Sequence, residues 1–337
     1  MAVPGNNQRE SCCVRVFKWI PVLFILSIVF WSYYAYIIQL CILTIEDVPK
    51  QIIYIFVYHC IYAMFLWAYW QTVLTPSGRV PDKFRLSEVE YDRILQAENE
   101  ETQRLMLEDF SRNLPNLNRT VSGSVRYCEK CRLVKPDRTH HCSVCGRCIL
   151  KMDHHCPWVN NCIGFTNYKF FVLFLGYALI YCIYVALTSV QYFIKFWHGT
   201  LEGTGRFHIL FLFFVALMFA ISLVSLFCYH CYLVLQNRTT LEAFRAPIFQ
   251  TGPDKQGFDL GKYNNFREIF GVKPKLWILP IPTSLGSGYI FPRRKYGDDT
   301  EQLISTTPYF LWDDEEEQLM TGNHDSSPSP DLGMGDP

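Results

Sequence analysis

Residues 128–162 read CEKCRLVKPDRTHHCSVCGRCILKMDHHCPWVNNC, and this stretch holds seven of the fourteen cysteines of the 337-residue chain together with four of its histidines. Cysteines interleaved with histidines at short, regular spacings are typical of a metal site in a reducing compartment. A disulfide framework needs an oxidising compartment and does not draw on histidine. We therefore interpret this segment as a metal-binding module, called the Cys/His module below (about residues 126–163).

An internal repeat of fourteen residues assigns the metal ligands. The pattern C-x2-C-x9-H-x6-C occurs twice, and the second copy begins before the first has closed. The first set is Cys128, Cys131, His141 and Cys148, and the second set is Cys142, Cys145, His155 and Cys162. Three cysteines and one histidine are a set that structural zinc favours. The repeat therefore predicts two interleaved zinc sites per chain, in preference to a group of buried cysteines without metal.

One cysteine of the module, Cys156, belongs to neither set. A third copy of the repeat would begin there, but its C-x-x-C partner position is Val159. A thiol with the ordinary pKa of ~8.5 is mostly protonated at neutral pH, whereas the thiolate is the nucleophile. A neighbouring histidine can accept that proton, and a carboxylate can orient the histidine. We therefore predict Cys156 as nucleophile, His154 as its base and Asp153 as the residue that orients the base.

Outside the module, the chain contains four long apolar blocks without Asp, Glu, Lys or Arg. They are Trp19–Leu43, Ile52–Leu74, Phe170–Ile194 and Phe207–Leu235. Each exceeds the ~20 residues that a helix needs to cross the ~30 Å hydrocarbon layer. Half of all residues are hydrophobic and only 18% are charged. We expect an all-α membrane protein with four transmembrane helices and a cytosolic double-zinc domain.

The distribution of Lys and Arg predicts the orientation. Residues 77–168 carry fourteen of them and the segment after residue 235 carries ten, whereas the short loops 46–50 and 196–206 hold one each. The positive-inside rule then places both termini and the long middle loop in the cytosol. The formal net charge is zero, so there is no overall basic field that would attract nucleic acid, and we expect no such partner.

The chain thus divides into consecutive parts with different tasks. These are a cytosolic N-terminus (1–18), transmembrane helices one and two (19–75), a cytosolic loop with the Cys/His module (76–168), transmembrane helices three and four (169–235), an ordered cytosolic C-terminal region (236–296) and a disordered acidic tail (297–337). Within the loop, residues 83–117 are mostly helix-forming, and Ser87-Glu88-Val89-Glu90 has the pattern of a helix start.

The position of Cys156 suggests its substrate, because the third apolar block begins shortly after it and places it near the lipid headgroups. A thiolate there can attack an acyl-CoA carbonyl and pass the acyl group to a second thiol. The module also carries four basic side chains that can provide positive charge for the phosphates of CoA. These are Arg126, Lys135, Arg138 and His140. The alternative for these four residues is a solvated basic face without a ligand.

With Asp153-His154-His155-Cys156, the Cys-rich core and four spans in this order, the chain resembles the DHHC family of protein S-acyltransferases, the palmitoyltransferases. It also looks like the vertebrate subgroup with four spans and a short cytosolic tail. The resemblance implies a ping-pong reaction in which Cys156 accepts a palmitoyl group from palmitoyl-CoA and donates it to cysteines of membrane-associated proteins. It also implies a Golgi membrane as the location, with the plasma membrane as the second choice.

The resemblance extends beyond the module. Thr239-Thr240-Leu241-Glu242 is similar to the TTxE motif of the family, and Asn265 matches the asparagine of its PaCCT motif. Both motifs imply a bracing role between the module and the spans. Ser32 and Tyr181 sit at positions similar to the residues at the ceiling of the family's acyl cavity, and the alternative for both is a role in helix packing. Trp158 resembles a family residue beside the acyl chain.

Alternatives remain at three points. Asp153 could instead be a hydrogen-bond partner of a zinc-bound histidine. A membrane-anchored RING-like binding module also has interleaved zinc sites, although it needs no nucleophile. A transporter would place ionisable residues inside the membrane, and the apolar blocks hold only His59, His208 and His230.

Overall fold

The computed structural model describes residues 16–201, 203 and 205–294. Four apolar helices are long enough to cross a membrane, as predicted. They are α2 (Ile20–Tyr33) continued by the π-helical η1 (Tyr34–Ile42), α3 (Val48–Leu74), α6 (Tyr168–Trp197) and α7 (Arg206–Leu235). The predicted acidic tail, residues 297–337, lies outside the described residues.

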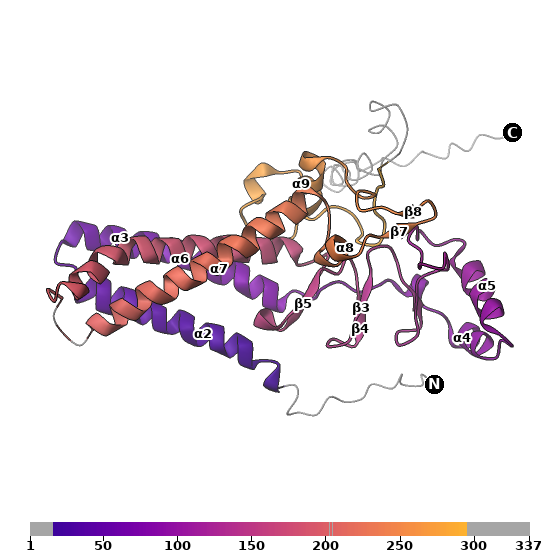
Figure 1. Cartoon of the computed structure of the whole chain (residues 1–337), viewed down its shortest axis with the longest axis horizontal. Helices are drawn as coiled ribbons and strands as arrows, with labels where there is room; N and C mark the ends of the chain where they lie inside the picture. The colour runs from indigo at the N-terminus through magenta and orange to yellow at the C-terminus, as the bar shows by residue number, and fades with distance from the viewer. Residues whose placement is uncertain (1–15, 202, 204, 295–337) are drawn as a thin grey trace, which may run out of the picture. The chain divides into compact units, whose positions relative to one another are not determined.

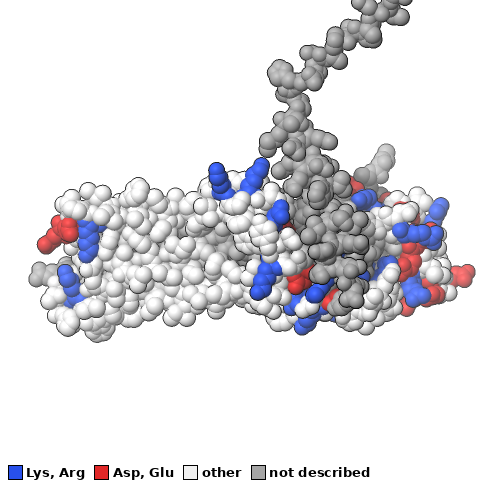
Figure 2. Space-filling view, turned by 90° about the horizontal axis from the view of Figure 1, so that it is seen from above, with Lys and Arg blue, Asp and Glu red and all other residues white. Residues whose placement is uncertain are grey.

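The four helices lie side by side as one bundle, in which α6 packs against both α3 and α7 (Figure 1). The face of the bundle seen in Figure 2 is free of Lys, Arg, Asp and Glu along the helices, and charged residues lie at its two ends. Apolar side chains such as Leu23, Phe56 and Leu187 are exposed on the bundle, which is the pattern expected for a surface covered by lipid. The fold is therefore that of a multi-pass membrane protein.

The loop between the second and third spans begins with short helical elements, which are η2 (Asp82–Phe84), α4 (Glu88–Leu95) and α5 (Glu100–Ser111). The predicted helix start at Ser87 is confirmed as a capping box. The Ser87 amide donates to Glu90 Oε2 over 2.8 Å, and the Glu90 amide donates to Ser87 Oγ over 3.2 Å. Two of the helix's orphan donors are thereby satisfied.

The Cys/His module contains three small antiparallel ladders. They pair β1 (Tyr127–Cys128) with β2 (Leu133–Val134), β3 (His140–Cys142) with β4 (Arg147–Ile149), and β5 (His154–Cys156) with β6 (Asn161–Ile163), and η3 (Pro157–Val159) joins the last two strands. The fourteen-residue repeat appears in the register, because His141 pairs with Cys148 just as His155 pairs with Cys162. Each repeat therefore folds as the same hairpin.

The C-terminal region packs beside the module and the ends of the helices (Figure 1). Its elements are α8 (Thr240–Phe244), β7 (Ile248–Phe249), β8 (Gly252–Pro253), α9 (Lys262–Phe270) and η4 (Pro274–Leu276). Asn265 Nδ2 donates to Leu235 O over 2.8 Å, and Asn265 Oδ1 accepts from the Leu260 amide over 2.9 Å. Since the last carbonyls of a helix lack intrahelical donors, Asn265 caps α7 and holds this region against it.

Candidate functional site

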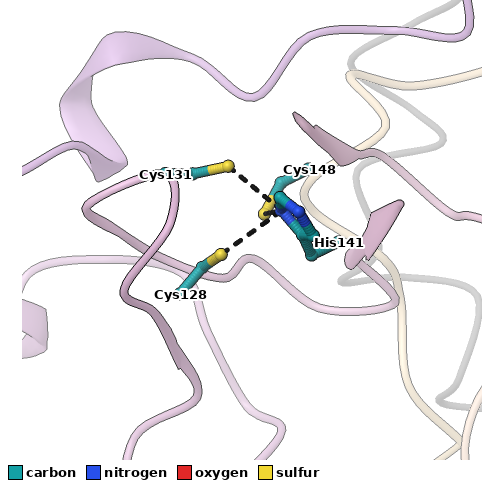
Figure 3. A group of neighbouring side chains, drawn as sticks. All are labelled: Cys128, Cys131, His141 and Cys148. Carbon is teal, nitrogen blue, oxygen red and sulfur yellow. Dashed lines mark hydrogen bonds between the residues drawn. The ribbon is translucent and has the colours of Figure 1, made fainter. Parts of the chain in front are cut away.

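The first predicted ligand set converges on one point (Figure 3). Cys128 and Cys131 come from the β1–β2 hairpin, and His141 and Cys148 come from β3 and β4. His141 Nδ1 lies 3.5, 3.2 and 3.9 Å from the sulfur atoms of Cys128, Cys131 and Cys148. Ligands that bind a tetrahedral zinc at ~2.0–2.3 Å stand roughly 3.5–3.8 Å apart. The four side chains therefore fit a single zinc ion.

The second set forms an equivalent cluster. His155 Nδ1 lies 3.8, 3.5 and 3.5 Å from the sulfur atoms of Cys142, Cys145 and Cys162. In both clusters the four ligand atoms lie within 4.8 Å of one another. The structure brings together the same two sets that the repeat predicts, and each cluster could bind zinc.

Strand β5 places the predicted catalytic residues relative to the second cluster. Side chains alternate between the two faces of a strand, so His154 and Cys156 lie on one face while His155 between them lies on the other. Cys156 belongs to neither cluster and is buried, with 6% of its surface exposed. His155, the residue of β5 that belongs to the second cluster, thus points away from Cys156 and leaves its thiol uncoordinated.

Asp153 and His154 form a closely coupled pair. His154 Nδ1 donates to Asp153 Oδ2 over 2.6 Å, and the same carboxylate accepts from the Thr240 amide and hydroxyl, each over 2.8 Å. Burial alone would raise the pKa of Asp153, but these hydrogen bonds and the His154 charge lower it. Asp153 is therefore an ionised carboxylate that fixes the ring of His154.

The other nitrogen of His154 is left for the thiol. Burial would lower the pKa of His154, but the hydrogen bond to Asp153 and the interaction with Cys156 raise it to about 9. An imidazole with this raised pKa is protonated at neutral pH, and its positive charge stabilises a neighbouring thiolate. The three residues thus have the relation expected for a base-activated nucleophile.

A histidine that the sequence did not single out for this site, His230 of α7, lies beside the pair. Its ring centroid lies 5.9 Å from that of His154, and its Nδ1 lies 3.1 Å from the hydroxyl of Tyr168. Phe171 packs edge-on against both His154 and His230, at 5.2 and 5.0 Å. The only hint in the sequence was a histidine near the cytosolic end of an apolar span.

An apolar cavity of about 470 Å³ extends from Cys156 into the helix bundle. His154, Cys156 and Trp158 line one part of it, and Ser32 and Tyr181 line another. The Ser32 and Tyr181 hydroxyls form a hydrogen bond of 2.7 Å, and Tyr181 forms a second one, of 2.8 Å, with Tyr58. The side chains between are almost all aliphatic or aromatic, so the cavity suits a hydrocarbon chain.

A second, polar cavity of about 840 Å³ lies between the module and the C-terminal region. All four basic residues of the predicted CoA site line it. Two of them, Arg138 and His140, do not provide the free positive charge that the sequence predicted for the CoA phosphates. The Arg138 side chain is fully buried and bound by acidic residues, and burial together with Arg126 lowers the pKa of His140 to about 4. Arg138 is therefore structural and His140 is a neutral imidazole, and positive charge in this cavity comes from Arg119, Arg126, Lys135 and Arg245.

Arg138 joins the module to the C-terminal region. Its Nε and one terminal nitrogen donate to the two carboxylate oxygens of Glu242 over 2.8 and 2.7 Å, and its other nitrogen donates to Asn237 Oδ1 over 2.8 Å. Lys151 and Glu268 form a second buried ion pair of 2.6 Å beside it. The predicted bracing role of the TTxE-like motif is thus visible as contacts, with Glu242 binding Arg138 and Thr240 binding the carboxylate of Asp153.

The two Cys3His clusters leave the Cys–His–Asp set unliganded, and its cysteine lines an apolar cavity among the membrane helices. These features together define a membrane acyltransferase. Residues 122–246 match the family model of the DHHC palmitoyltransferases. Palmitoyltransferase ZDHHC2 of Danio rerio is 53% identical over 298 residues, which cover 88% of this chain and 82% of that protein. Palmitoyltransferase ZDHHC15 of Homo sapiens is 50% identical over 318 residues, covering 94% and 93%. The chain belongs to the DHHC palmitoyltransferase family and is a protein S-palmitoyltransferase, not a RING-like binding module.

Proposed function

We propose that Cys156 is the residue that carries the acyl group. The observation that supports this most directly is the position of its sulfur, which is held beside His154 and opens on the apolar cavity while both metal clusters are complete without it. A fatty acyl chain attached to this sulfur would extend into the cavity toward Ser32 and Tyr181. Trp158 lines the same cavity near the thioester.

The reaction proceeds in two thioester exchanges. The Cys156 thiolate attacks the carbonyl carbon of palmitoyl-CoA, a new C–S bond forms, and the bond to the CoA sulfur breaks. His154, protonated and oriented by Asp153, transfers its proton to the departing CoA thiolate. The thiol of a substrate protein then gives a proton to His154 and attacks the Cys156 thioester, and Cys156 leaves again as a thiolate.

Zinc in both clusters would serve the structure alone. Cys128, Cys131, His141 and Cys148 would hold one ion, and Cys142, Cys145, His155 and Cys162 would hold the other. A closed tetrahedral site without an open position leaves no place for substrate. The ions would contribute the folding energy of a module that has little apolar core.

The polar cavity is the proposed site of the CoA headgroup. Arg126, Lys135 and Arg245 supply positive charge for its phosphates, and His140 can donate or accept a hydrogen bond. Among the described residues, the buried Asn118 Nδ2 and Tyr127 hydroxyl that face this region have no hydrogen-bond partner. Buried polar groups without partners are costly, so a polar ligand here would be stabilised by them.

The proposed location is the Golgi membrane, with the plasma membrane as the second choice. Both termini and the Cys/His module would lie in the cytosol. The excess of Lys and Arg on the module side of the spans supports this orientation. The substrates would be cysteine-containing proteins at the cytosolic surface of that membrane.

The test is acyl uptake by the purified full-length protein. A labelled palmitoyl-CoA analogue should give a hydroxylamine-labile adduct that is lost in Cys156→Ser while the zinc content stays near two per chain. Cys182→Ser is the matched control, because Cys182 is also buried and lines the same cavity. Zinc loss in Cys156→Ser, or loss of the adduct in Cys182→Ser rather than Cys156→Ser, would contradict the assignment.

A further inference from the structure

The side chain of Asn161 caps the second span from outside the helix. Its Nδ2 donates to the carbonyls of Thr72, Val73 and Thr75 over 3.1, 3.3 and 2.8 Å. The last carbonyls of an α-helix have no donor within the helix, and α3 ends at Leu74. Asn161 is itself buried, with 9% of its surface exposed. The Cys/His module therefore supplies the C-terminal cap of a transmembrane helix.

Asn161 lies directly opposite the nucleophile. In the β5–β6 hairpin, Cys156 and Asn161 are paired residues. The same hairpin is held a second time by α3, because the Tyr69 hydroxyl donates to Trp158 O over 3.1 Å. Two contacts about one helical turn apart on α3 thus fix the segment that carries the sulfur.

The same helix also carries the far end of the apolar cavity. Tyr58 of α3 binds the Tyr181 hydroxyl, which in turn binds Ser32. Fourteen residues separate Tyr58 from Thr72, which corresponds to ~21 Å at the rise of an α-helix. This length is comparable to that of an extended sixteen-carbon chain. Helix α3 therefore spans from the β5–β6 hairpin, which carries Cys156, to the end of the cavity formed by Ser32 and Tyr181, called the ceiling below.

We propose that Asn161 is a positioning residue that sets the acyl-chain length the enzyme accepts, because its cap on α3 fixes the distance between Cys156 Sγ and the ceiling. The inference rests on the proposed role of Cys156 as acyl carrier in this cavity. A hairpin that could slide along the helix end would leave that distance undefined. An apolar pocket of defined depth discriminates by about tenfold or more for one methylene group.

The test compares Asn161→Asp with Asn160→Asp. Asn161→Asp removes both amide donors and places a negative charge against three carbonyl oxygens and the negative end of the α3 dipole, so it pushes the hairpin away from the helix. Asn160→Asp makes the same chemical change one residue earlier. Asn160 lies at the turn with φ of 48°, a conformation that Asp tolerates, and its side chain makes no hydrogen bond to the described residues.

Each full-length variant is mixed with equal amounts of myristoyl-, palmitoyl- and stearoyl-CoA, and the acyl groups on Cys156 are quantified by mass spectrometry. We expect the stearoyl-to-myristoyl ratio to rise at least about threefold in Asn161→Asp, as a deeper cavity requires, and to stay at the wild-type value in Asn160→Asp. A merely structural role for Asn161 would lower the total acylation or the zinc content without changing the ratio.

If Asn161→Asp loses zinc, Asn161→Ala is the deciding variant, because it removes the amide donors to the three carbonyls without adding a charge and leaves all metal ligands in place. The ratio should then rise in the same direction. An unchanged ratio in a zinc-loaded Asn161→Asp, or in Asn161→Ala when the first variant loses zinc, overturns the inference. A wild-type protein that forms no adduct on Cys156 would instead overturn the proposed function, so the two failures are distinguishable.

Discussion

The buried ion pair between Arg138 and Glu242 offers the sharpest stability test. Both partners are withdrawn from water, with side-chain exposures of 0% and 6%, and they meet in a bidentate geometry. Removing one member of such a pair leaves an uncompensated buried charge and costs about 3–5 kcal/mol. In Glu242→Gln, Arg138 keeps Asn237 at 2.8 Å and Glu268 at 3.8 Å. We therefore expect the lower end of that range, about 3 kcal/mol.

The assay is thermal unfolding of the detergent-solubilised protein, followed by tryptophan fluorescence. At about 2–4 °C per kcal/mol for domains of this size, Glu242→Gln should lower the Tm by about 6–12 °C. Glu101→Gln is the matched control, because Arg104 and Glu101 also meet at 2.7 Å but with exposures of 46% and 61%. An exposed pair contributes ~1 kcal/mol or less. Equal Tm shifts in the two variants would refute the reasoning that burial decides the cost.

Three further predictions follow from the contacts at the site. Burial would raise the pKa of Glu242, but Arg138 lowers that pKa below the ordinary ~4.3. The stability that the ionised Glu242 contributes is therefore present above this pH and is lost on acidification. The Tm measured from pH 7 to 4 should accordingly fall more steeply in the wild type than in Glu242→Gln. His155→Ala should bring zinc, measured by mass spectrometry, well below two per chain, whereas His154→Ala should keep the metal and lose acyl uptake, and equal zinc loss in both would argue against the ligand assignment. The sequence holds two N-x-T glycosylation sequons, Asn118-Arg119-Thr120 and Asn237-Arg238-Thr239, whose asparagines are both buried. Both should stay unglycosylated in cells, and a glycosidase-sensitive shift on a gel would contradict the cytosolic orientation.

The features predicted well from sequence are those fixed by local spacing. The four spans follow from uncharged length, and the predicted and observed boundaries differ by at most a few residues, as at Trp19 against Ile20. The ligand pairing follows from a repeat whose two copies fold as the same hairpin. Both depend on residues close together in the chain, which is where sequence patterns constrain structure most directly.

The features missed depend on contacts between distant segments. Arg138 looked like a surface cation, because nothing nearby in sequence reveals a partner 104 residues away, at Glu242. Nothing in the sequence placed His230 beside His154 or Tyr58 beside Tyr181, because only the packing of the spans brings these residues together. The π-helical continuation of the first span likewise has no simple sequence signature.

The overlap of the two ligand sets has a consequence for how the enzyme acquires its metal. Adjacent residues of β3, His141 and Cys142, point to different clusters, so one short strand is clamped from both sides. Emptying either cluster frees a strand on which the other depends. We expect loading to be all-or-none, and a cell short of zinc would hold a smaller number of complete enzymes rather than a full complement of half-built ones.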